Sequence, residues 1–297
     1  MAALGKKPYV HDDRNLRFSK YSTSLPAPQP TANWDHYVSA WPMFLNDQLG
    51  DCTCAEVAHQ FELWCATSGA GFSIGDADVE ALYEAVGGYV PGDPATDQGC
   101  VIQQVLDYLQ KTGMGPGGSY RIDAYTAVAP LNHTEVAQAI DLFGGVDIGL
   151  QLPTAAQSMG QHWTAPPGWP APTPIGQPQP VPTPAPHRHP WWDLWADIES
   201  WINPPQPAPG PQPAPTPPLT GDWTPGSWGG HSVYALGYDA AGVTVVTWGE
   251  LTAVDWGFWD AYVDECWALL SHSFVNPAGL AASGFDLAAL QADLAAL

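Results

Sequence analysis

The stretch LNDQLGDCTCAEVAH, residues 45–59, places two cysteines at the expected start of a helix. Asp51 is a residue type favoured at helix N-caps, and Gly50 lets the backbone turn sharply before it. Cys52 then lies in the first turn, where unpaired backbone amides and the helix dipole favour a thiolate. Cys54 points about 200° around the helix from Cys52, so only one of the two faces a given cleft. We expect a nucleophilic cysteine here and favour Cys52.

A thiolate nucleophile needs an imidazole partner, which usually comes from a distant part of the chain. The stretch SWGGHSVYALGYD, residues 227–239, offers His231 at the start of a predicted strand, and the glycines before it leave room for a substrate. His187 and His189 lie among prolines, and His59 lies two turns inside the first helix. His231 is therefore the predicted general base.

Hydrophobic periodicity divides the chain into a helical half and a strand half. Apolar residues recur every three or four positions over residues 52–67, and similar patterns predict helices at residues 77–86, 100–111 and 134–142. GGVDIGLQLP, residues 144–153, is typical of a strand. HSVYALGYD and GVTVVTWGE, which begin at residues 231 and 242, predict a hairpin. The fold class is therefore α+β.

The predicted organisation has five parts. Residues 1–33 form an extended basic arm, residues 34–164 a helical half, and residues 220–275 a β half. Between the halves, residues 165–219 form an insertion with most of the chain's 32 prolines, which favour polyproline II spacers. Within it, WWDLWADIESWI at residues 191–202 predicts a tryptophan-rich helix. Residues 276–297 predict an amphipathic C-terminal helix.

Composition excludes some classes of function. With 8 basic against 30 acidic residues, the net charge of −22 argues against nucleic acid as a partner. No apolar run is long enough to span a membrane or to act as a signal peptide, so we expect a soluble protein, either cytoplasmic or part of a virus particle. Five cysteines without framework-like spacing are typical of reduced thiols.

The cysteine and histidine stretches together resemble the papain-like cysteine peptidases, including the bacteriocin-processing peptidases. The resemblance covers residues 40–65 and 225–262, with GGHSVYALGYD and the following TWG as its stronger part. It implies a helical half that carries the cysteine, packed on an antiparallel β half that carries the histidine. It also implies a thiol hydrolase that cleaves peptide or amide bonds, with a peptide or protein as substrate and no cofactor or metal.

The resemblance implies an oxyanion amide six residues before the nucleophile. Two registers meet this rule, Asn46 with Cys52 and Gln48 with Cys54. The first retains the Asp-Cys step of the bacteriocin-processing peptidases, and it also places the cysteine at the helix start. We favour that register and keep Gln48 and Cys54 as the alternative.

The third catalytic position departs from the family pattern. The family has an asparagine or aspartate shortly before Trp-Gly, which orients the histidine ring, whereas this chain has Val246 and Thr247 before Trp248. Valine cannot orient an imidazole. Thr247 can accept one hydrogen bond through its hydroxyl, and Asp239 or Glu250 can substitute if the fold brings either one near.

Three other interpretations compete with a peptidase. Cys52, Cys54 and His59 are metal-ligating residue types, but the spacing lacks the paired ligands of structural zinc sites. In the second interpretation, the cysteines are plain core residues with no chemical role. In the third interpretation, the chain is a catalytically relaxed or inactive papain-like protein with a structural role in an assembly such as a bacterial-virus particle. In that case the basic arm or the tryptophan-rich helix binds a protein partner.

Overall fold

The computed structural model describes residues 4–12, 14–22, 27–176 and 216–271. The predicted tryptophan-rich helix and C-terminal helix lie outside these residues. The chain divides into two units, one of Met1–Gly176 with Pro218–Leu297 and one of Gln177–Pro217. The fold described below is that of the first unit.

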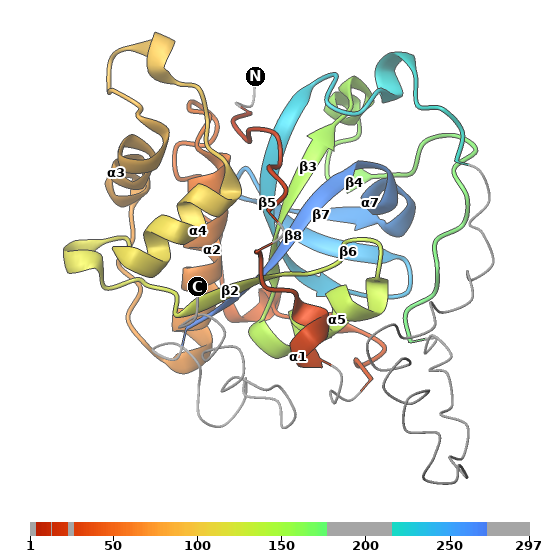
Figure 1. The fold of residues 1–297 in the computed structure, drawn as a ribbon, viewed down its shortest axis with the longest axis horizontal. Helices are drawn as coiled ribbons and strands as arrows, with labels where there is room; N and C mark the ends of the chain where they lie inside the picture. Colours follow the sequence, from red (N-terminus) through yellow and green to blue (C-terminus); the bar gives the residue numbers. More distant parts are fainter. Residues whose placement is uncertain (1–3, 13, 23–26, 177–215, 272–297) are drawn as a thin grey trace, which may run out of the picture. The chain divides into compact units, whose positions relative to one another are not determined.

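Three helices pack on one side of this unit, labelled α2, α3 and α4 in Figure 1. They are α2 (Cys52–Ser68), α3 (Asp76–Gly87) and α4 (Ile102–Lys111). α2 is the central one, because almost all its side chains from Cys52 to Cys65 are buried. α4 buries only one stripe, made by Ile102, Val105, Leu106 and Leu109. The helices predicted at residues 52–67, 77–86 and 100–111 are thereby confirmed.

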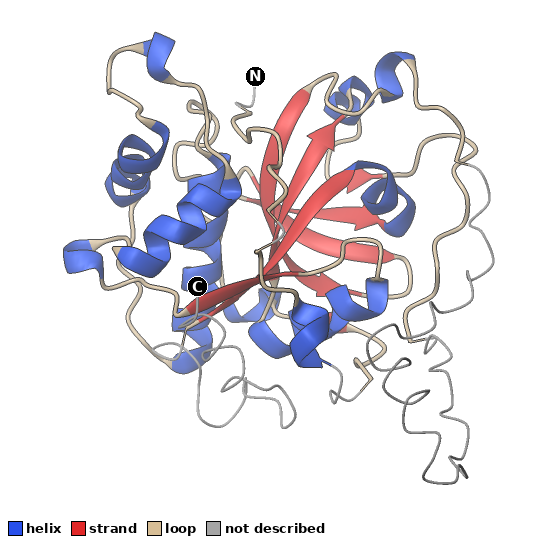
Figure 2. Ribbon diagram, in the orientation of Figure 1, coloured by secondary structure: helices blue, strands red, loops and turns tan. Residues whose placement is uncertain are grey.

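A mostly antiparallel sheet forms the other side, shown in red in Figure 2. Its strand order is β2-β8-β3-β5-β6-β7-β4, and β1 pairs with β5 outside this path. The strands are β1 (Ala32–Asn33), β2 (Ala124–Ala127), β3 (Val146–Leu152), β4 (His162–Trp163), β5 (Gly229–Tyr238), β6 (Gly242–Thr247), β7 (Glu250–Asp255) and β8 (Val263–Leu270). The predicted strand at residues 144–153 and the predicted hairpin correspond to β3 and to β5 with β6.

The two faces of the sheet bury different cores. The strands pack on one side against α5 (His133–Phe143) and α7 (Trp256–Tyr262), with Val233, Ala235 and Ile148 among the buried residues. On the other side Tyr234 and Leu236 of β5 pack against Leu63 of α2. Side chains alternate along a strand, so β5 serves both cores at once. α5 confirms the helix predicted at residues 134–142.

The N-terminal residues do not extend away from the fold as an arm. Residues 4–7, which we call the inserted segment, run between the helical side and the sheet, where the backbone of Lys6 donates to Gly230 and that of Lys7 to Cys100. Further along, α1 (Phe18–Ser22) packs with its buried Phe18 against Phe143 of α5. The expectation of an extended arm over residues 1–33 does not include α1, which forms where Phe18 packs on the core.

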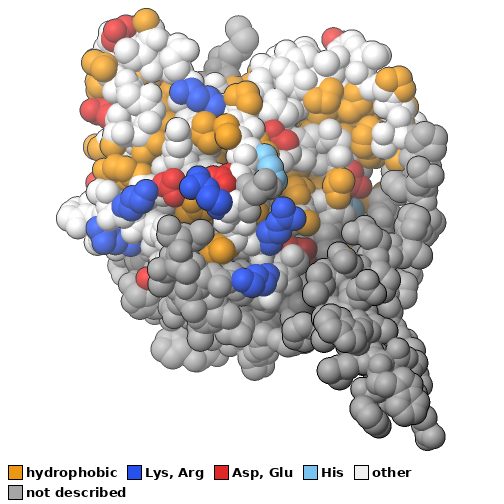
Figure 3. Space-filling view, viewed as in Figure 1, with side chains coloured by type: hydrophobic (Ala, Val, Ile, Leu, Met, Phe, Trp, Pro, Cys, Tyr) orange, Lys and Arg blue, Asp and Glu red, His pale blue; other side chains and the backbone are white. Residues whose placement is uncertain are grey.

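Several basic side chains lie on the face of the molecule that is seen in Figure 3. Figure 3 shows Lys and Arg side chains spread over the face seen in Figure 1, with acidic side chains between them. Lys6 is an exception, since its residue is only 5% exposed. The N-terminal arm thus contributes one buried cation to the interior of an acidic protein.

Candidate active site

Cys52 begins α2 and is buried at the contact between that helix and β5. The backbone amide of Ser232, the residue after His231, lies against the Cys52 thiol, and so does the backbone amide of Gly5. The helical hydrogen bonds begin with the Ala55 amide, which donates to the Asp51 carbonyl four residues earlier. The Cys52 amide comes before that point and therefore has no acceptor inside the helix. The nucleophile candidate therefore has free helix-terminal donors on one side and the histidine strand on the other.

The Cys52 thiol is protonated in this arrangement. Burial is the main cause that raises its pKa to about 12, and the Glu56 carboxyl one turn along α2 adds to the effect. The Gly5 and Ser232 amides act in the opposite direction but are outweighed. The sequence favoured a thiolate at this helix start. The structure instead holds a neutral thiol, because burial outweighs the two amide donors.

Cys54 points to a different part of the protein. Its thiol interacts with the thiol of Cys100 and with the hydroxyl of Thr53, inside the core formed by the helices. Burial raises the pKa of Cys54 well above its usual value. The two neighbouring cysteines thus lie on opposite sides of α2, and of the pair it is Cys52 that meets the strand of His231.

His231 is fully buried, and its ring is held from two sides. Its Nε2 lies 2.8 Å from the Thr247 hydroxyl oxygen, and the ring of Trp248 stacks on it with centroids 4.4 Å apart. Within the described residues Nδ1 has no hydrogen-bond partner, and the ring makes no hydrogen bond to Cys52. Burial lowers the pKa of His231 to about 3. The ring is therefore a neutral imidazole with one nitrogen unoccupied.

Trp248 is placed by a strained turn between β6 and β7. Thr247 pairs with Glu250, so Trp248 and Gly249 form a two-residue hairpin turn, with φ values of 47° and 71°. Such turns favour asparagine followed by glycine, and a bulky residue at positive φ costs about 1–3 kcal/mol. The sequence accepts that cost at the position where the indole covers His231, which is typical of strain held at functional sites.

The two candidate oxyanion amides lie in different environments. The Asn46 side-chain amide is buried and donates to the Asp51 carboxylate at 3.0 Å. Gln48 is exposed, and its amide lies 3.5 Å from the Asp47 carboxylate. Asp51 makes no side-chain hydrogen bond to the α2 amides, so the expected capping role of its carboxylate is wrong. Asn46 attracts that carboxylate instead.

Asp239 and Glu250, the other proposed partners of His231, are used elsewhere. The Asp239 carboxylate accepts bonds from the Ala241 and Gly242 amides in the β5–β6 turn. Glu250 accepts a bond from Gln161. Of Asp239, Glu250 and Thr247, it is therefore Thr247 that holds the imidazole.

Buried carboxyl groups lie behind Cys52, between α2 and the sheet. Burial raises the pKa of Glu56 well above its usual range, and the nearby Asp147 carboxyl of β3 adds to the effect. Burial does the same to Asp147, which has no hydrogen-bond partner among the described residues. Burial also raises the pKa of Asp51 to about 7. No local sequence pattern indicates this cluster, because Glu56 and Asp147 lie far apart in the chain.

From the raised pKa values of these carboxyls we predict that the protein is less stable at pH 8 than at pH 5. A carboxyl whose pKa is higher in the folded state stabilises it at low pH, and that contribution is lost as pH rises through the folded pKa, by about 1.4 kcal/mol per pH unit. Asp51, Glu56 and Asp147 act in this direction. Burial lowers the pKa of His231 to about 3 and that of His59 to about 4. These two histidines therefore raise the free energy of unfolding as pH rises toward 6.5, which opposes the carboxyls. Because three carboxyls act against two histidines, the free energy of unfolding falls overall as pH rises.

Thermal unfolding followed by circular dichroism tests this prediction. We expect Tm to fall by more than about 5 °C between pH 5 and pH 8, given roughly 2–4 °C per kcal/mol for a protein of this size. Asp51→Asn is the matched control, since it keeps an acceptor for Asn46 and removes one titrating group, so its fall is smaller. A Tm that is flat or that rises over this range contradicts the burial of these carboxyls.

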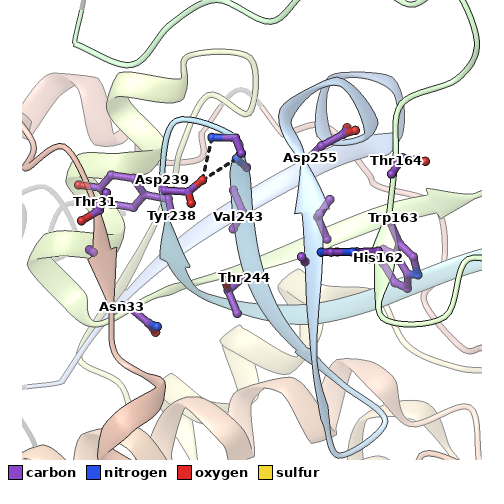
Figure 4. Close-up of a pocket in the computed structure, with 15 residues that line it drawn as sticks. Thr31, Asn33, His162, Trp163, Thr164, Tyr238, Asp239, Val243, Thr244 and Asp255 are labelled. Atoms are coloured by element: carbon purple, nitrogen blue, oxygen red, sulfur yellow. Dashed lines mark hydrogen bonds between the residues drawn. The ribbon is translucent and has the colours of Figure 1, made fainter.

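A separate pocket of about 540 Å³ lies at the far ends of β5, β6 and β7, next to β4. Figure 4 shows Asp239, Asp255 and His162 among its lining residues. The Asp255 carboxylate accepts bonds from the Ala165 and Phe258 amides, so both of the labelled carboxylates serve the local backbone. Tyr238 at this pocket lies roughly 23 Å along β5 from His231, at about 3.3 Å per residue. It is not part of the Cys52 site.

The described part of the chain has neither a metal-binding cluster nor a membrane-spanning helix. No group of three or more His, Cys, Asp or Glu side chains there is arranged to hold a metal ion. None of its helices combines the length and the apolar character needed to cross a membrane.

Comparison with known proteins identifies the fold. No protein-family model matches the chain, and no curated protein matches its sequence. Among solved structures, the chain is similar to xylellain, a cysteine protease from Xylella fastidiosa, with a TM-score of 0.57 and 13% identity over 91% of this chain and 96% of that one. It also matches digestive procathepsin L 3 from the Tenebrio molitor larval midgut, with a TM-score of 0.45 and 13% identity over 91% of this chain and 75% of that one.

The fold is that of the papain-like cysteine peptidases. The similarity to xylellain agrees with the helical side that carries Cys52 and the antiparallel sheet that carries His231. The predicted α+β, papain-like fold class is thereby confirmed. At 13% identity the comparison concerns the fold, and the chemistry is argued from this chain's own residues.

Proposed function

We propose that this protein is a papain-like thiol hydrolase that cleaves peptide or amide bonds. The observation that supports it most strongly is the position of Cys52, at a helix N-terminus and in contact with the amide of Ser232, the residue after a histidine that Thr247 and Trp248 hold in place. Cys54, the alternative nucleophile, contacts Cys100 in the helical core instead.

The chemistry assigns one role to each group. With its proton on Nε2, the His231 ring donates to the Thr247 hydroxyl, and Nδ1 is left to take the proton of the Cys52 thiol. The thiolate attacks the carbonyl carbon of the substrate, and the imidazolium then protonates the leaving amine. The free amide at Cys52, together with the Gln48 or Asn46 side chain, stabilises the oxyanion.

Thr247 orients the imidazole less strictly than a carboxamide does. A carbonyl oxygen only accepts, so it fixes the proton on Nε2, whereas a hydroxyl can rotate and donate to Nε2. The wrong tautomer leaves no lone pair on Nδ1. Val246 and Thr247 therefore favour slower catalysis than the family's asparagine or aspartate would allow.

A structural role without catalysis is the second candidate, and specific observations favour it. Cys52 is covered, its pKa is raised to about 12, and its sulfur makes no hydrogen bond to His231 in the described structure. A protein that keeps the fold for an assembly would have these properties. The proposals differ in what happens to Cys52 once the inserted segment is displaced.

Alkylation by iodoacetamide between pH 4 and pH 9 distinguishes the two. Gly5→Val displaces the inserted segment, because a Cβ on Gly5 would lie 1.7 Å from the Gly50 carbonyl oxygen. We expect slow labelling of Cys52 in the wild type. In Gly5→Val we expect fast labelling at pH 6 that disappears when His231→Ala is added, because the thiolate is then no longer paired. Mass spectrometry of each cysteine provides the readout, with Cys54 as the internal control.

The competing proposal makes a different prediction for the same protein. If Cys52 in Gly5→Val is labelled with a single midpoint near the free-thiol pKa of about 8.5, and His231→Ala leaves the profile unchanged, the thiol and imidazole do not act together. The fold would then serve a purpose other than hydrolysis.

A further inference from the structure

His59 lies inside α2, two turns after Cys52, and faces the loop that precedes this helix. The residue is 3% exposed, and its Nε2 lies 2.8 Å from the Pro42 carbonyl oxygen. Burial lowers the pKa of His59 to about 4, which keeps the ring neutral. A carbonyl oxygen can only accept, so the ring carries its proton on Nε2 and donates it to Pro42. His59 is therefore a fixed hydrogen-bond donor to the loop.

Two aromatic residues of the same loop pack on this imidazole. The Trp41 ring meets it edge-on with centroids 5.7 Å apart, and the Phe44 ring lies tilted against it at 5.1 Å. Phe44 is 1% exposed, so this packing is part of the interior. One side chain of α2 thus holds the loop both by a hydrogen bond and by ring contacts.

The loop backbone next to this contact is strained. Phe44 and Leu45 have φ values of 53° and 65°, in the left-handed region that bulky residues rarely adopt. Such a conformation persists only where the surrounding structure holds it. The packing of Phe44 on His59 holds it from one side. From the other side the Gln48 and Leu49 amides donate to the Leu45 carbonyl at 2.8 and 2.9 Å.

The strained turn sets the direction of both candidate oxyanion side chains. Asn46 directly follows the turn, and its backbone amide donates to the Met43 carbonyl at 3.1 Å. Gln48 lies two positions later and bonds back to the turn through its own amide. If the turn relaxed to ordinary backbone angles, both side chains would change direction relative to Cys52.

The same loop borders the turn that covers the candidate base. A Cβ on Gly249 would lie 3.1 Å from the Trp41 carbonyl oxygen and 3.6 Å from the Met43 amide nitrogen, so the loop backbone passes against this glycine. Gly249 follows Trp248, whose indole stacks on His231. The loop is therefore placed to affect both the oxyanion side chains and the histidine.

We propose that His59 is a positioning residue, which holds residues 41–49 in the strained conformation that presents an oxyanion-stabilising side chain at the Cys52 site. The role in catalysis rests on the proposed function, whereas the hold on the loop does not. The sequence offers His59 as a metal-ligating residue type. The structure uses it as a donor to Pro42, and its Nδ1 has no hydrogen-bond partner among the described residues.

Hydrogen–deuterium exchange in the full chain tests the hold on the loop, with His59→Met and His59→Gln as a matched pair. The glutamine amide can donate to the Pro42 carbonyl in place of Nε2, whereas methionine fills similar space without a donor. In peptides that cover residues 41–49 we expect exchange at least tenfold faster in His59→Met than in the wild type. In His59→Gln we expect it to stay within threefold of the wild type.

Peptides from α5 report opening of the whole fold and serve as the internal control. Unchanged exchange of the loop in His59→Met, or an equal increase in both variants, overturns the inference. An increase that α5 shares equally also overturns it, because the protein then opens as a whole and the loop is not held by His59 in particular.

Peptide hydrolysis in the Gly5→Val background links the loop to catalysis. An oxyanion forms only in the reaction, so we expect His59→Met to lower kcat at least tenfold while KM changes less than threefold. His59→Gln should recover most of kcat. Faster loop exchange with an unchanged kcat overturns the positioning role. If Gly5→Val itself hydrolyses no peptide while the exchange result holds, the proposed function fails and the hold on the loop stands, so the two failures are distinguishable.

Discussion

Lys6→Met is expected to destabilise the protein by about 3–5 kcal/mol, the usual cost of removing one partner from a buried ion pair. The methionine fills most of the space of the lysine stem, so little of the loss comes from packing. The cost arises at Glu265, whose carboxylate is 1% exposed and is left beside Asp264 without a cation. Asp264 is 27% exposed and can be solvated, so it contributes less.

Urea denaturation of four proteins measures this contribution: the wild type, Lys6→Met, Glu265→Gln and the double variant. In the double variant the carboxamide removes the unpaired charge, so we expect it to recover at least half of the lost free energy of unfolding. Arg14→Met serves as the surface control, because the Arg14 side chain is 82% exposed. Such a substitution should change the free energy of unfolding by no more than about 0.5 kcal/mol. If the Lys6 and Glu265 effects simply add, the ion pair is not a buried one.

Local pattern was enough to predict α2 to α5 and the strands β3, β5 and β6, but not α7 or the strands β1, β2, β4, β7 and β8. The residue spacing in α2, α4 and α5 predicts helices because each of them packs an apolar face on the core. The β-branched and aromatic residues of β5 and β6 predict strands for the equivalent reason. The short α1 was not predicted, because its existence depends on the packing of Phe18 against Phe143.

The site was predictable only in part, because most of its physics is long-range. The candidate pair Cys52 and His231 has local signals, namely a helix start and a glycine-flanked strand. Nothing near Lys6 in the sequence indicates that it meets Asp264 and Glu265, which lie more than 250 residues away in the chain. The raised pKa of Cys52 likewise depends on its burial in the folded chain, with the Glu56 carboxyl adding to the effect. Pattern alone therefore indicates the candidate nucleophile and misses the burial that keeps its thiol protonated.

Cys52→Ala is expected to abolish hydrolysis, with a loss of at least about 10³-fold in kcat/KM, since removal of a nucleophile leaves only transition-state binding. Cys54→Ala is the matched control. It removes the same sulfur two residues away, where the thiol contacts Cys100 and not the histidine strand. We expect Cys54→Ala to retain activity within about threefold, with some loss of stability from the small cavity that it leaves.

Both substitutions belong in the Gly5→Val background, in which the inserted segment no longer fills the site. The measurement that tests the account most directly is the initial rate of cleavage of internally quenched peptides of varied sequence. The account predicts cleavage by Gly5→Val and by Gly5→Val with Cys54→Ala, and none by Gly5→Val with Cys52→Ala. Cleavage that survives Cys52→Ala, or that is lost with Cys54→Ala alone, would contradict the assignment of Cys52 as the nucleophile.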